Sequence, residues 1–305
     1  MTVQTFLDQA TKRLKRAGIG TARLDCLVLL EDVMATDRAS LLAHPEREMN
    51  AEHLQQLEKM VAQRAEHIPL AQVRGKTEFY GREFIITPAV LEPRPESETM
   101  IELLLNLPLD STKKVHIVDV GAGSGAIGIT AVLELPDARV SLVDIDEAAL
   151  MVAAQNAARF ELDLPCIVDD LLSHAAKRGA KPDILLANLP YVPDSYQINT
   201  AALHEPRIAI FGGPDGLDLY RRLFMQCETL QPTYVMTESL PFQHTDLAAI
   251  ANAKGYQLLQ TADFIQVFVP DGSDQLQVAA VKAIPESLAS TAPAANSTAE
   301  LPTSL

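Results

Sequence analysis

Several features that would restrict the fold are missing from this sequence. It has no continuous apolar stretch near the roughly 18 residues of a membrane-spanning helix, and no apolar signal-type segment follows its early basic cluster. Its three cysteines, Cys26, Cys166 and Cys227, are far apart and odd in number, so they offer neither a disulfide framework nor a zinc pattern. The seven histidines are equally scattered. We therefore expect a cytoplasmic protein with reduced thiols, no metal site and no membrane partner.

Positive charge is scarce and unevenly distributed. The formal net charge is −15. Residues 1–80 contain 11 Lys and Arg against 11 Asp and Glu, whereas residues 81–305 contain 14 against 29, so the acidic excess lies after residue 80. Binding to nucleic acid takes much of its affinity from neutralising phosphates. Because an acidic body works against such binding, no direct nucleic-acid partner is expected.

The first part of the chain carries three helical stripes. Apolar residues recur at helical spacing around residues 6–14, 24–33 and 54–61. Gly18, Gly20 and Pro45 separate these segments. The pattern predicts a compact helical domain over residues 1–75. Such a domain is either a packing appendage or a docking surface for a macromolecular substrate.

From residue 76 the pattern changes to strands. Residues 79–86 predict a β-hairpin, which we place in a linker over residues 76–92. Two prolines around Arg94 make residues 93–96 a stiff, extended loop, and residues 98–105 then read as a helix. Strands are expected after that at 115–120, 139–144, 166–168, 183–187 and 234–237, with a closing antiparallel pair at 257–259 and 266–269.

Helices are expected between these strands, at residues 125–135 and 147–160 and near 215–229 and 243–254. Repeated strand–helix units predict an α/β fold with a mostly parallel sheet and helices on both faces, here over residues 93–281. Residues 282–305 are rich in Ala, Ser, Thr and Pro, and no basic residue follows Lys282. They have too little bulky apolar content to pack, so we predict a disordered tail.

A glycine-rich segment, residues 118–128, lies at a predicted strand-to-helix junction. Glycines there let the backbone turn tightly and let a ligand approach without a Cβ in the way. Asp144 closes the next strand, where a carboxylate can accept both ribose hydroxyl protons. The segment fits a dinucleotide pattern, Gly-x-Gly-x-x-Ala, and also the Asp-x-Gly-x-Gly-x-Gly pattern of S-adenosylmethionine enzymes, which we favour.

A second motif, Asn188-Leu189-Pro190-Tyr191, follows an apolar run at the end of the strand expected over 183–187. Ligands of open α/β sheets bind beyond the carboxyl ends of the strands. The amide oxygen of Asn188 and the carbonyl of residue 189 can accept both hydrogens of an NH2 group and leave its nitrogen lone pair free. A hydride-transfer enzyme has no specific use for this arrangement. The motif therefore predicts methylation of a planar nitrogen, with Tyr191 stacked on the substrate group.

Four segments together resemble the HemK-type protein-(glutamine-N5) methyltransferases, which modify peptide chain release factors. The resemblance covers roughly residues 1–270. The segments are Phe79-Tyr80-Gly81 with Pro93-Arg94-Pro95-Glu96, the Asp119–Gly125 loop, Asn188–Tyr191, and His204-Glu205-Pro206 with residues 211–218. Their order along the chain is more specific than any one of them.

The resemblance implies a Rossmann-like, seven-stranded class I S-adenosylmethionine methyltransferase domain with a small N-terminal all-helical domain. It implies that the cofactor, S-adenosyl-L-methionine, is held by Asp119, Gly121, Ala122, Gly123, Ser124, Gly125, Asp144, Leu171 and Asn188. The implied catalytic set is Asn188, Pro190 and Tyr191. The implied substrate-binding set is Asn188, Leu189, Pro190 and Tyr191, with Arg94 and Pro95 from the loop that walls the site. The implied partner is a release factor, whose Gly-Gly-Gln glutamine accepts the methyl group, and we expect the enzyme to be a monomer.

The sequence departs from the family pattern in three places. Leu189 stands where proline is common, but the acceptor required there is a backbone carbonyl, which leucine also provides. Leu171, near the adenine, stands where relatives often have an aromatic residue, so it offers apolar contact without stacking. Residues 235–239 and 264–267 match the family poorly.

Three other functions stay open at this point. Ribosomal RNA adenine-N6 methyltransferases carry a similar motif, which would stack a flipped base on Tyr191. The charge distribution and the segments 93–96 and 211–218 argue against that function. The second alternative is methylation of a glutamine in a ribosomal protein. The third is a fold that binds S-adenosylmethionine as a sensor or scaffold without catalysis.

Overall fold

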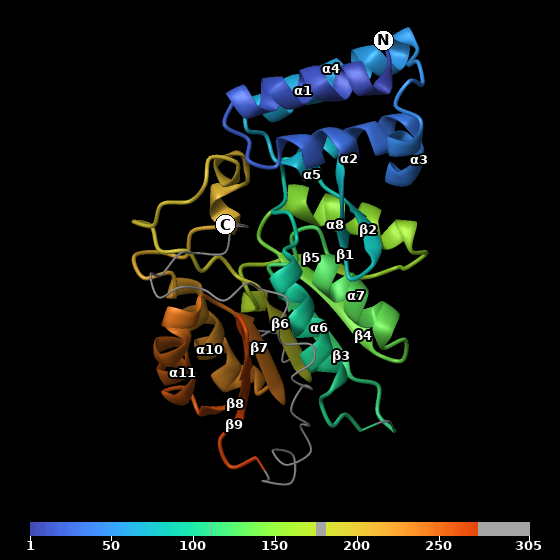
Figure 1. Cartoon of the computed structure of the whole chain (residues 1–305). Coiled ribbons are helices and arrows are strands. Elements are labelled where there is room, and N and C mark those ends of the chain that lie inside the picture. The colour runs from blue at the N-terminus through green and yellow to red at the C-terminus, as the bar shows by residue number, and fades with distance from the viewer. Residues whose placement is uncertain (111, 175–180, 274–305) are drawn as a thin grey trace. The chain divides into compact units, whose positions relative to one another are not determined.

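The computed structural model describes residues 1–110, 112–174 and 181–273 (Figure 1). They divide into two compact units. The first contains Met1–Thr77, Ile86–Pro88 and Asn199–His204, and the second contains Glu78–Ile85, Ala89–Ile198 and the chain from Glu205 onward. The tail predicted over residues 282–305 lies outside the described residues, as do the last residues of the domain predicted over 93–281.

The first unit contains the helices α1 (Val3–Arg16), α2 (Ala22–Met34), α3 (Arg38–Ala43), α4 (Ala51–Ala65) and α5 (Leu70–Arg74). Polar caps begin three of them, because Thr2, Asp37 and Asn50 each accept a hydrogen bond from a backbone N–H three residues later. The three predicted stripes coincide with α1, α2 and α4. The two short helices were not predicted, since five or six residues show too little of the helical period.

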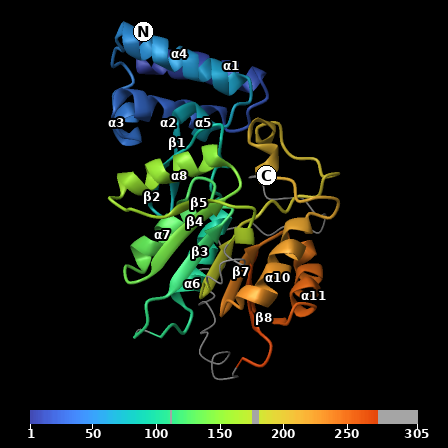
Figure 2. The same cartoon turned by 180° about the vertical axis from the view of Figure 1, so that it is seen from behind.

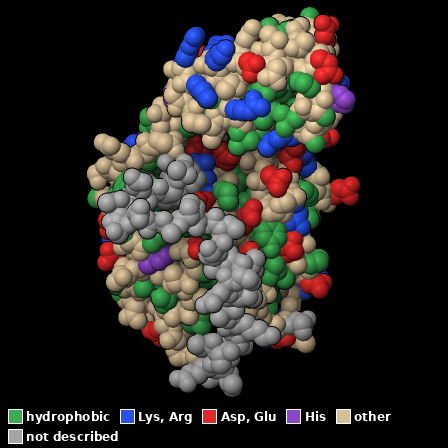
Figure 3. Space-filling view, in the orientation of Figure 1, with side chains coloured by type: hydrophobic (Ala, Val, Ile, Leu, Met, Phe, Trp, Pro, Cys, Tyr) green, Lys and Arg blue, Asp and Glu red, His purple; other side chains and the backbone are tan. Residues whose placement is uncertain are grey.

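The apolar stripes of the first unit meet in one core. Phe6, Leu14, Leu30 and Leu57 are at most 1% exposed. The opposite side of α1 exposes its four basic residues, Lys12, Arg13, Lys15 and Arg16. Lys and Arg side chains gather on the face of this unit seen in Figure 3. The helical unit therefore presents a locally basic surface although residues 1–80 carry no formal net charge.

The second unit is built on a seven-stranded sheet, which confirms the predicted fold class (Figures 1 and 2). Its strands are β3 (His116–Val120), β4 (Arg139–Asp144), β5 (Cys166–Val168), β6 (Ile184–Ala187), β7 (Tyr234–Glu238), β8 (Tyr256–Ala262) and β9 (Ile265–Pro270). They lie in the order β5-β4-β3-β6-β7-β9-β8. All neighbours from β5 to β7 pair in parallel, whereas β9 pairs antiparallel with β7 and β8. A separate two-stranded sheet joins β1 (Lys76–Phe79) to β2 (Arg82–Ile85), the predicted hairpin.

The helices of this unit are α6 (Glu98–Leu105), α7 (Ala126–Glu134), α8 (Glu147–Arg159), α10 (Asp218–Leu230) and α11 (His244–Asn252). Short 3-10 turns occur at η1 (Pro95–Ser97), η2 (Ala202–His204, in the first unit), η3 (Arg207–Ala209) and η4 (Pro241–Gln243). The helices and strands of this unit agree with the predicted ones to within a few residues at each end.

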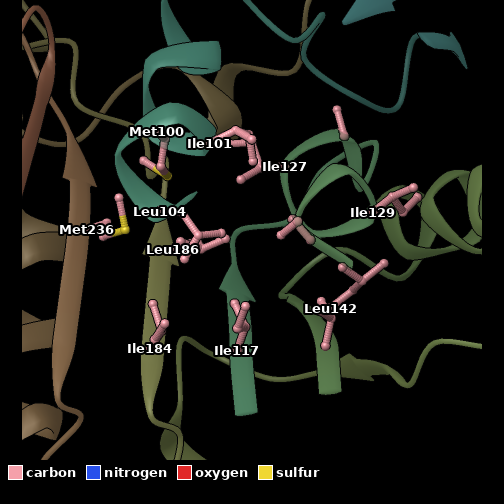
Figure 4. Close-up of a cluster of buried hydrophobic side chains, with 14 of the residues drawn as sticks. Met100, Ile101, Leu104, Ile117, Ile127, Ile129, Leu142, Ile184, Leu186 and Met236 are labelled. Carbon is pink, nitrogen blue, oxygen red and sulfur yellow. The ribbon is translucent and has the colours of Figure 1, made fainter. Parts of the chain in front are cut away.

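Helices cover both faces of the sheet, as predicted. Ile117, Ile184 and Met236 point to the face on which α6 and α7 pack (Figure 4). On the other face, Phe224 of α10 contacts Phe268 of β9 edge to face, with ring centroids 5.3 Å apart. Each apolar side chain of this size contributes roughly 1.5–3 kcal/mol when it is fully buried. The central strand β6, buried at all four positions, is therefore held between two apolar layers.

The strand order changes direction between β3 and β6. From β3 the chain builds outward through β4 to β5, and it then returns to place β6 on the other side of β3. The loops that follow β3 and β6 consequently diverge to opposite faces and leave a crevice at the carboxyl edge of the sheet. Both predicted motifs, the glycine-rich loop and Asn188–Tyr191, follow these two strands.

Candidate active site

A cavity of about 280 Å³ opens at this crevice. Its lining comes from the ends of four parallel strands and the loops after them, β3, β4, β5 and β6, together with residues 89–91, residues 206–209 and the first turns of α10. Of the residues implied by the resemblance, the lining includes Gly121, Gly123, Asp144, Leu171, Asn188, Leu189 and Pro190. The topology thus brings together residues that are up to 133 positions apart in the chain, from Ala89 to Arg222.

The glycine-rich loop is fixed by its own backbone. The N–H groups of Gly121 and Ala122 donate to the carbonyl oxygen of Val143, at 2.8 and 3.0 Å. Gly121 has a φ of 74°, and a Cβ built on it would lie 3.0 Å from a methyl carbon of Leu189. Glycine is therefore needed at this position for the left-handed backbone and for the close approach of the second motif.

Asp119 lies behind the loop, against α7, and does not line the cavity. Its side chain is 1% exposed, and its Oδ2 accepts a hydrogen bond of 2.8 Å from the backbone N–H of Gly128 in α7. Burial raises the pKa of Asp119 to about 7, against the lowering effect of that hydrogen bond. A Cβ on Gly128 would lie 2.4 Å from Leu142, so strand and helix meet closely here. Asp119 therefore acts on the loop through the backbone.

Asp144 ends β4 at the rim of the cavity. Its two carboxylate oxygens accept backbone hydrogen bonds, Oδ2 from Gly123 and Oδ1 from Asp146, each at 2.9 Å. Burial raises the pKa of Asp144, and these hydrogen bonds oppose the rise. Each oxygen keeps a further acceptor position, so the carboxylate can receive two hydroxyl groups, as a ribose would offer.

Leu171 follows the Asp169-Asp170 pair at the end of β5 and lines the cavity with both acids. It is 6% exposed and has a φ of 55°, in the left-handed region. Asp170 forms an ion pair with Arg222 of α10, at 2.5 Å, and Arg222 also lines the cavity. This end of the cavity therefore has an apolar wall beside a carboxylate that is paired with an arginine, and such surroundings suit a flat heterocycle.

The second motif is positioned by strand register. Ala187 of β6 pairs with Thr237 of β7, so Asn188 and Glu238 leave neighbouring strands side by side. Side chains alternate along a strand, and both therefore point to the face that α6 covers. The Asn188 Nδ2 donates to Ser97 Oγ at the beginning of α6, at 3.0 Å. Its amide is thereby held by the nitrogen end, and Oδ1 stays available as an acceptor.

Glu238 and Ser97 were missed by the sequence analysis. Glu238 is 1% exposed, and its carboxylate accepts hydrogen bonds from Ser97 Oγ, at 2.6 Å, and from the Tyr191 hydroxyl, at 3.0 Å. Burial raises the pKa of Glu238 to about 7, opposed by the hydrogen bonds from Ser97 and Tyr191 and, to a smaller extent, by the nearby Asn188 amide. An acid at the end of a strand adjacent to the motif was the available signal. Residues 235–239, which contain Glu238, match the family pattern poorly, so the resemblance did not identify this residue.

Tyr191 does not lie on the cavity wall. Its side chain is 8% exposed, and burial together with the nearby Glu238 carboxylate raises its pKa well above the ordinary value. Its backbone carbonyl accepts a hydrogen bond from Gln243 Nε2 at 2.8 Å. The ring stacking predicted for Tyr191 stays a prediction, since in this structure the residue contributes its hydroxyl to Glu238.

The segment 211–218 clamps the backbone of the motif. The Gly212 N–H donates to the carbonyl oxygen of Val192, and the Val192 N–H donates to the carbonyl oxygen of Ile210, each at 3.0 Å. A Cβ on Gly212 would lie 2.2 Å from the carbonyl oxygen of Pro190. A Cβ on Gly216 would lie 2.0 Å from the carbonyl oxygen of Tyr191. The glycines of this segment therefore let two segments of the chain lie in direct backbone contact. This gives the family marker a physical role that its composition did not reveal.

Glu205 holds the Pro93–Glu96 loop. Its carboxylate forms an ion pair with Arg94, at 2.5 Å, and accepts a hydrogen bond from the backbone N–H of Glu92, at 2.9 Å. Burial raises the pKa of Glu205, and the Arg94 guanidinium opposes the rise. Arg94 and Pro95 do not line the cavity. They contribute to the site by setting the course of the loop that leads to Ser97.

The residues present fit S-adenosylmethionine. The cavity combines a glycine loop without side-chain bulk, a carboxylate suited to a ribose, an apolar wall at Leu171 and an amide oxygen at Asn188. No pyrophosphate site is needed for this cofactor. Within the described residues, no group of three or more His, Cys, Asp or Glu side chains is placed to hold a metal ion. A search of the same residues for a helix long and apolar enough to span a membrane found none.

Comparison with known proteins supports the same assignment. The PrmC N-terminal domain family matches residues 5–75, and the methyltransferase small domain family matches residues 98–205. The release factor glutamine methyltransferase of Koribacter versatilis is 39% identical over 237 residues, which cover 76% of this chain and 84% of that protein. The protein of the same name from Moorella thermoacetica is 40% identical over 73% of this chain and 79% of its own length. The corresponding protein of Bacillus subtilis is 35% identical over 74% and 79%. The chain is therefore an S-adenosylmethionine-dependent methyltransferase, and it belongs to the release factor glutamine methyltransferase family.

Proposed function

We propose that this chain transfers a methyl group from S-adenosylmethionine to the side-chain amide nitrogen of the glutamine in the Gly-Gly-Gln motif of a peptide chain release factor. The orientation of the Asn188 amide carries the proposal. Its nitrogen is bound to Ser97, so its oxygen is the end left to accept hydrogen bonds beside the cavity.

An amide nitrogen is a poor nucleophile because its lone pair is delocalised into the carbonyl group. Asn188 Oδ1 and the carbonyl of Leu189 accept one N–H each from the target amide. Two such hydrogen bonds favour a more pyramidal nitrogen and stabilise the positive charge that develops on it. They also hold the nitrogen in line for attack, which removes the orientational cost of the reaction.

When bound, S-adenosylmethionine supplies an electrophilic methyl group on a sulfonium sulfur. Gly121, Gly123 and Asp144, which line the cavity, would hold the cofactor, and Asn188–Pro190 would hold the amide. The new carbon–nitrogen bond forms as the carbon–sulfur bond breaks, and the methylated amide then releases one proton to water. No covalent enzyme intermediate and no strong general base are required.

The helical unit is proposed to dock the release factor. Its exposed basic residues on α1 offer a surface that differs in charge from the acidic remainder of the chain. A macromolecular substrate needs contacts beyond a single glutamine side chain, because one buried amide supplies little binding area. This assignment follows the expectation that residues 1–75 serve substrate docking.

The test is to incubate the purified chain with labelled S-adenosylmethionine and three substrates in parallel: a release factor, ribosomal proteins and RNA. We expect the label on the Gly-Gly-Gln peptide of the release factor, located by mass spectrometry. Label on a ribosomal protein glutamine instead would move the assignment to that substrate. Label on adenine, with binding that weakens steeply as salt rises, would indicate an RNA enzyme. Cofactor binding without label anywhere would indicate a sensor or scaffold.

A further inference from the structure

Four side chains from three separate parts of the fold form one hydrogen-bonded group, in which Asn188 is half-buried and the other three are buried. We define the amide network as Asn188 after β6, Tyr191 three residues later, Ser97 at the beginning of α6, and Glu238 at the end of β7. Ser97 and Glu238 are each 1% exposed. Neither is among the residues that line the cavity.

The hydrogen bonds of the amide network have a defined direction. An ionised carboxylate can only accept hydrogen bonds, so the Ser97 hydroxyl must donate its single proton to Glu238 Oε2, at 2.6 Å. The lone pairs of Ser97 Oγ then face Asn188, whose Nδ2 donates to them at 3.0 Å. The Tyr191 hydroxyl donates to the other oxygen, Glu238 Oε1, at 3.0 Å.

This direction decides which end of the Asn188 amide is free. A flipped amide would place Oδ1 against Ser97 Oγ, whose proton is already committed to Glu238, and two acceptors would face each other without a hydrogen. A buried pair left unsatisfied in this way costs about 1–3 kcal/mol. The carboxylate thus excludes the orientation in which an N–H group, rather than an oxygen, would be left for the target amide.

We propose that Glu238 is a positioning residue for methyl transfer: acting through Ser97, it fixes the Asn188 amide with Oδ1 available to grip the substrate NH2 group. Protonated Glu238 can donate a proton to Ser97, whose own proton can then be donated to Asn188 Oδ1. Both orientations of the Asn188 amide become satisfiable in that state, so the grip loses its fixed direction. The inference rests on the proposed function, because only an amide-accepting site requires this orientation.

The protonation state of Glu238 should therefore appear in the pH profile. The groups that face its carboxyl group are Tyr191 after β6, Tyr220 of α10, whose hydroxyl donates to the Glu238 carbonyl, and Glu96 of η1, whose charge helps to raise the pKa. The two tyrosines stay neutral below pH 10 because burial raises the pKa of each. The kcat should rise with pH through about 7, the pKa of Glu238, as the acceptor-only form becomes populated.

The test compares Glu238→Gln and Ser97→Ala with Ser239→Ala. Ser239 is a matched control, because it is 0% exposed, follows Glu238 directly, and its hydroxyl has no hydrogen-bond partner among the described residues. Both network variants should lose roughly 10- to 100-fold in kcat, the usual cost of a misplaced reacting group, with KM for the release factor changed less than about threefold. The control should keep its kcat. The rise of kcat with pH should disappear in Glu238→Gln.

A double variant tests whether Glu238 acts through Ser97 or whether the two residues contribute to kcat independently. If Glu238 acts through Ser97, Ser97→Ala/Glu238→Gln should have a kcat within about threefold of Ser97→Ala alone. If the fold losses in kcat of the two single variants multiply in the double variant, the proposal is overturned. If Glu238→Gln fails to fold, Ser97→Ala still tests it, since an unchanged kcat in Ser97→Ala would be equally contradictory.

A readout that needs no turnover distinguishes this proposal from the proposed function. The side-chain amide resonances of Asn188 in 15N-labelled protein are identified by their absence from Asn188→Ala. They should shift and broaden in Ser97→Ala and Glu238→Gln and stay in place in Ser239→Ala. Unchanged Asn188 resonances in both network variants would overturn the proposal. If wild type methylates no release factor but the resonances shift as expected, the proposed function fails and the fixed amide orientation stands.

Discussion

The two halves of the site are built in different ways. The glycine-loop half, formed by β3, β4 and the loop between β3 and α7, is held through the backbone N–H groups of the loop. The Gly121 N–H donates to the carbonyl oxygen of Val143, and the Gly123 N–H donates to the Asp144 carboxylate. The amide half is held by side chains, because Asn188, Ser97 and Glu238 come from three elements that are far apart in the chain. The first half depends on glycine and local turns, whereas the second depends on strand register and helix placement.

Each half contains one fully buried carboxyl group whose pKa is raised to about 7 by burial. Asp119 receives one backbone hydrogen bond, from Gly128, and shapes the loop, and the nearby Asp144 carboxylate also raises its pKa. Glu238 receives two side-chain hydroxyl groups and orients a third polar side chain. A similar carboxyl group therefore serves loop geometry in one half and amide direction in the other. Substitutions in the two halves should consequently separate cofactor affinity from turnover.

The largest expected effect is that of Asn188→Ala. Loss of one preorganised hydrogen-bonding group at the reacting nitrogen should reduce the single-turnover rate of methyl transfer roughly 10²- to 10³-fold. The affinity for S-adenosylmethionine, measured by calorimetry, should stay within about twofold, because the glycine-loop half is untouched. A variant that transfers methyl groups at nearly the wild-type rate would show that the amide grip is wrong.

The next largest effect is expected on stability, from Glu205→Ala. This change removes the 1% exposed partner of the Arg94 guanidinium, which is 14% exposed and then keeps the more distant Glu92, at 3.7 Å. It should lower the free energy of unfolding by about 3 kcal/mol. Glu83→Ala removes the partner of Arg159 in an ion pair whose side chains are both 43% exposed, and it should cost at most about 1 kcal/mol. Urea denaturation of both variants makes the comparison. Equal losses of unfolding free energy in the two variants would mean that the Arg94–Glu205 pair stabilises the fold no more than the exposed pair does.

A smaller effect should follow from Asp144→Asn in the glycine-loop half. The amide cannot accept at both oxygens as the carboxylate does, so the hydrogen bond from Gly123 or a ribose contact is lost. The Kd for S-adenosylmethionine should rise about tenfold, near the lower value of a hydrogen bond to a charged group. The rate at saturating cofactor should change little. A lower rate with an unchanged Kd would place Asp144 in the chemical step.

The smallest effect is expected from Gly123→Ala. Gly123 has a φ of 53°, but a Cβ there would meet no atom within 4 Å. Only the left-handed backbone then opposes the substitution, at about 1 kcal/mol of unfolding free energy. Thermal denaturation with and without cofactor checks this value. A much larger loss would mean that the loop tolerates less than its open surroundings indicate.

The difference between the two halves of the site also explains which of its residues could be predicted from the sequence. The glycine-rich loop and Asp144 lie within one strand–helix–strand unit, so local spacing was enough to identify them. The Asn188–Tyr191 motif was also local, but the partners that orient it were not. Glu238 is 50 positions and Ser97 is 91 positions from Asn188. Their approach depends on the pairing of β6 with β7 and on the packing of α6, which no single segment encodes.

Two segments have structural roles that their sequences did not reveal. Residues 211–218 read as a family marker with little chemistry, yet Gly212 and Gly216 hold the backbone of the motif. Arg94 and Pro95 were expected at the substrate, and that role stays a prediction. In the structure Arg94 binds Glu205, a contact between residues 111 positions apart. Buried ion pairs of this kind depend on tertiary structure and leave no periodic signal.

The central claim is that the site holds a primary amide by both of its N–H groups, through Asn188 Oδ1 and the Leu189 carbonyl. The most direct test is the mass spectrum of the Gly-Gly-Gln peptide after prolonged incubation of the release factor with enzyme and excess S-adenosylmethionine. We expect the glutamine to carry one methyl group and no more, because the monomethylated amide keeps a single N–H for two acceptors. A dimethylated glutamine would contradict this account of the site.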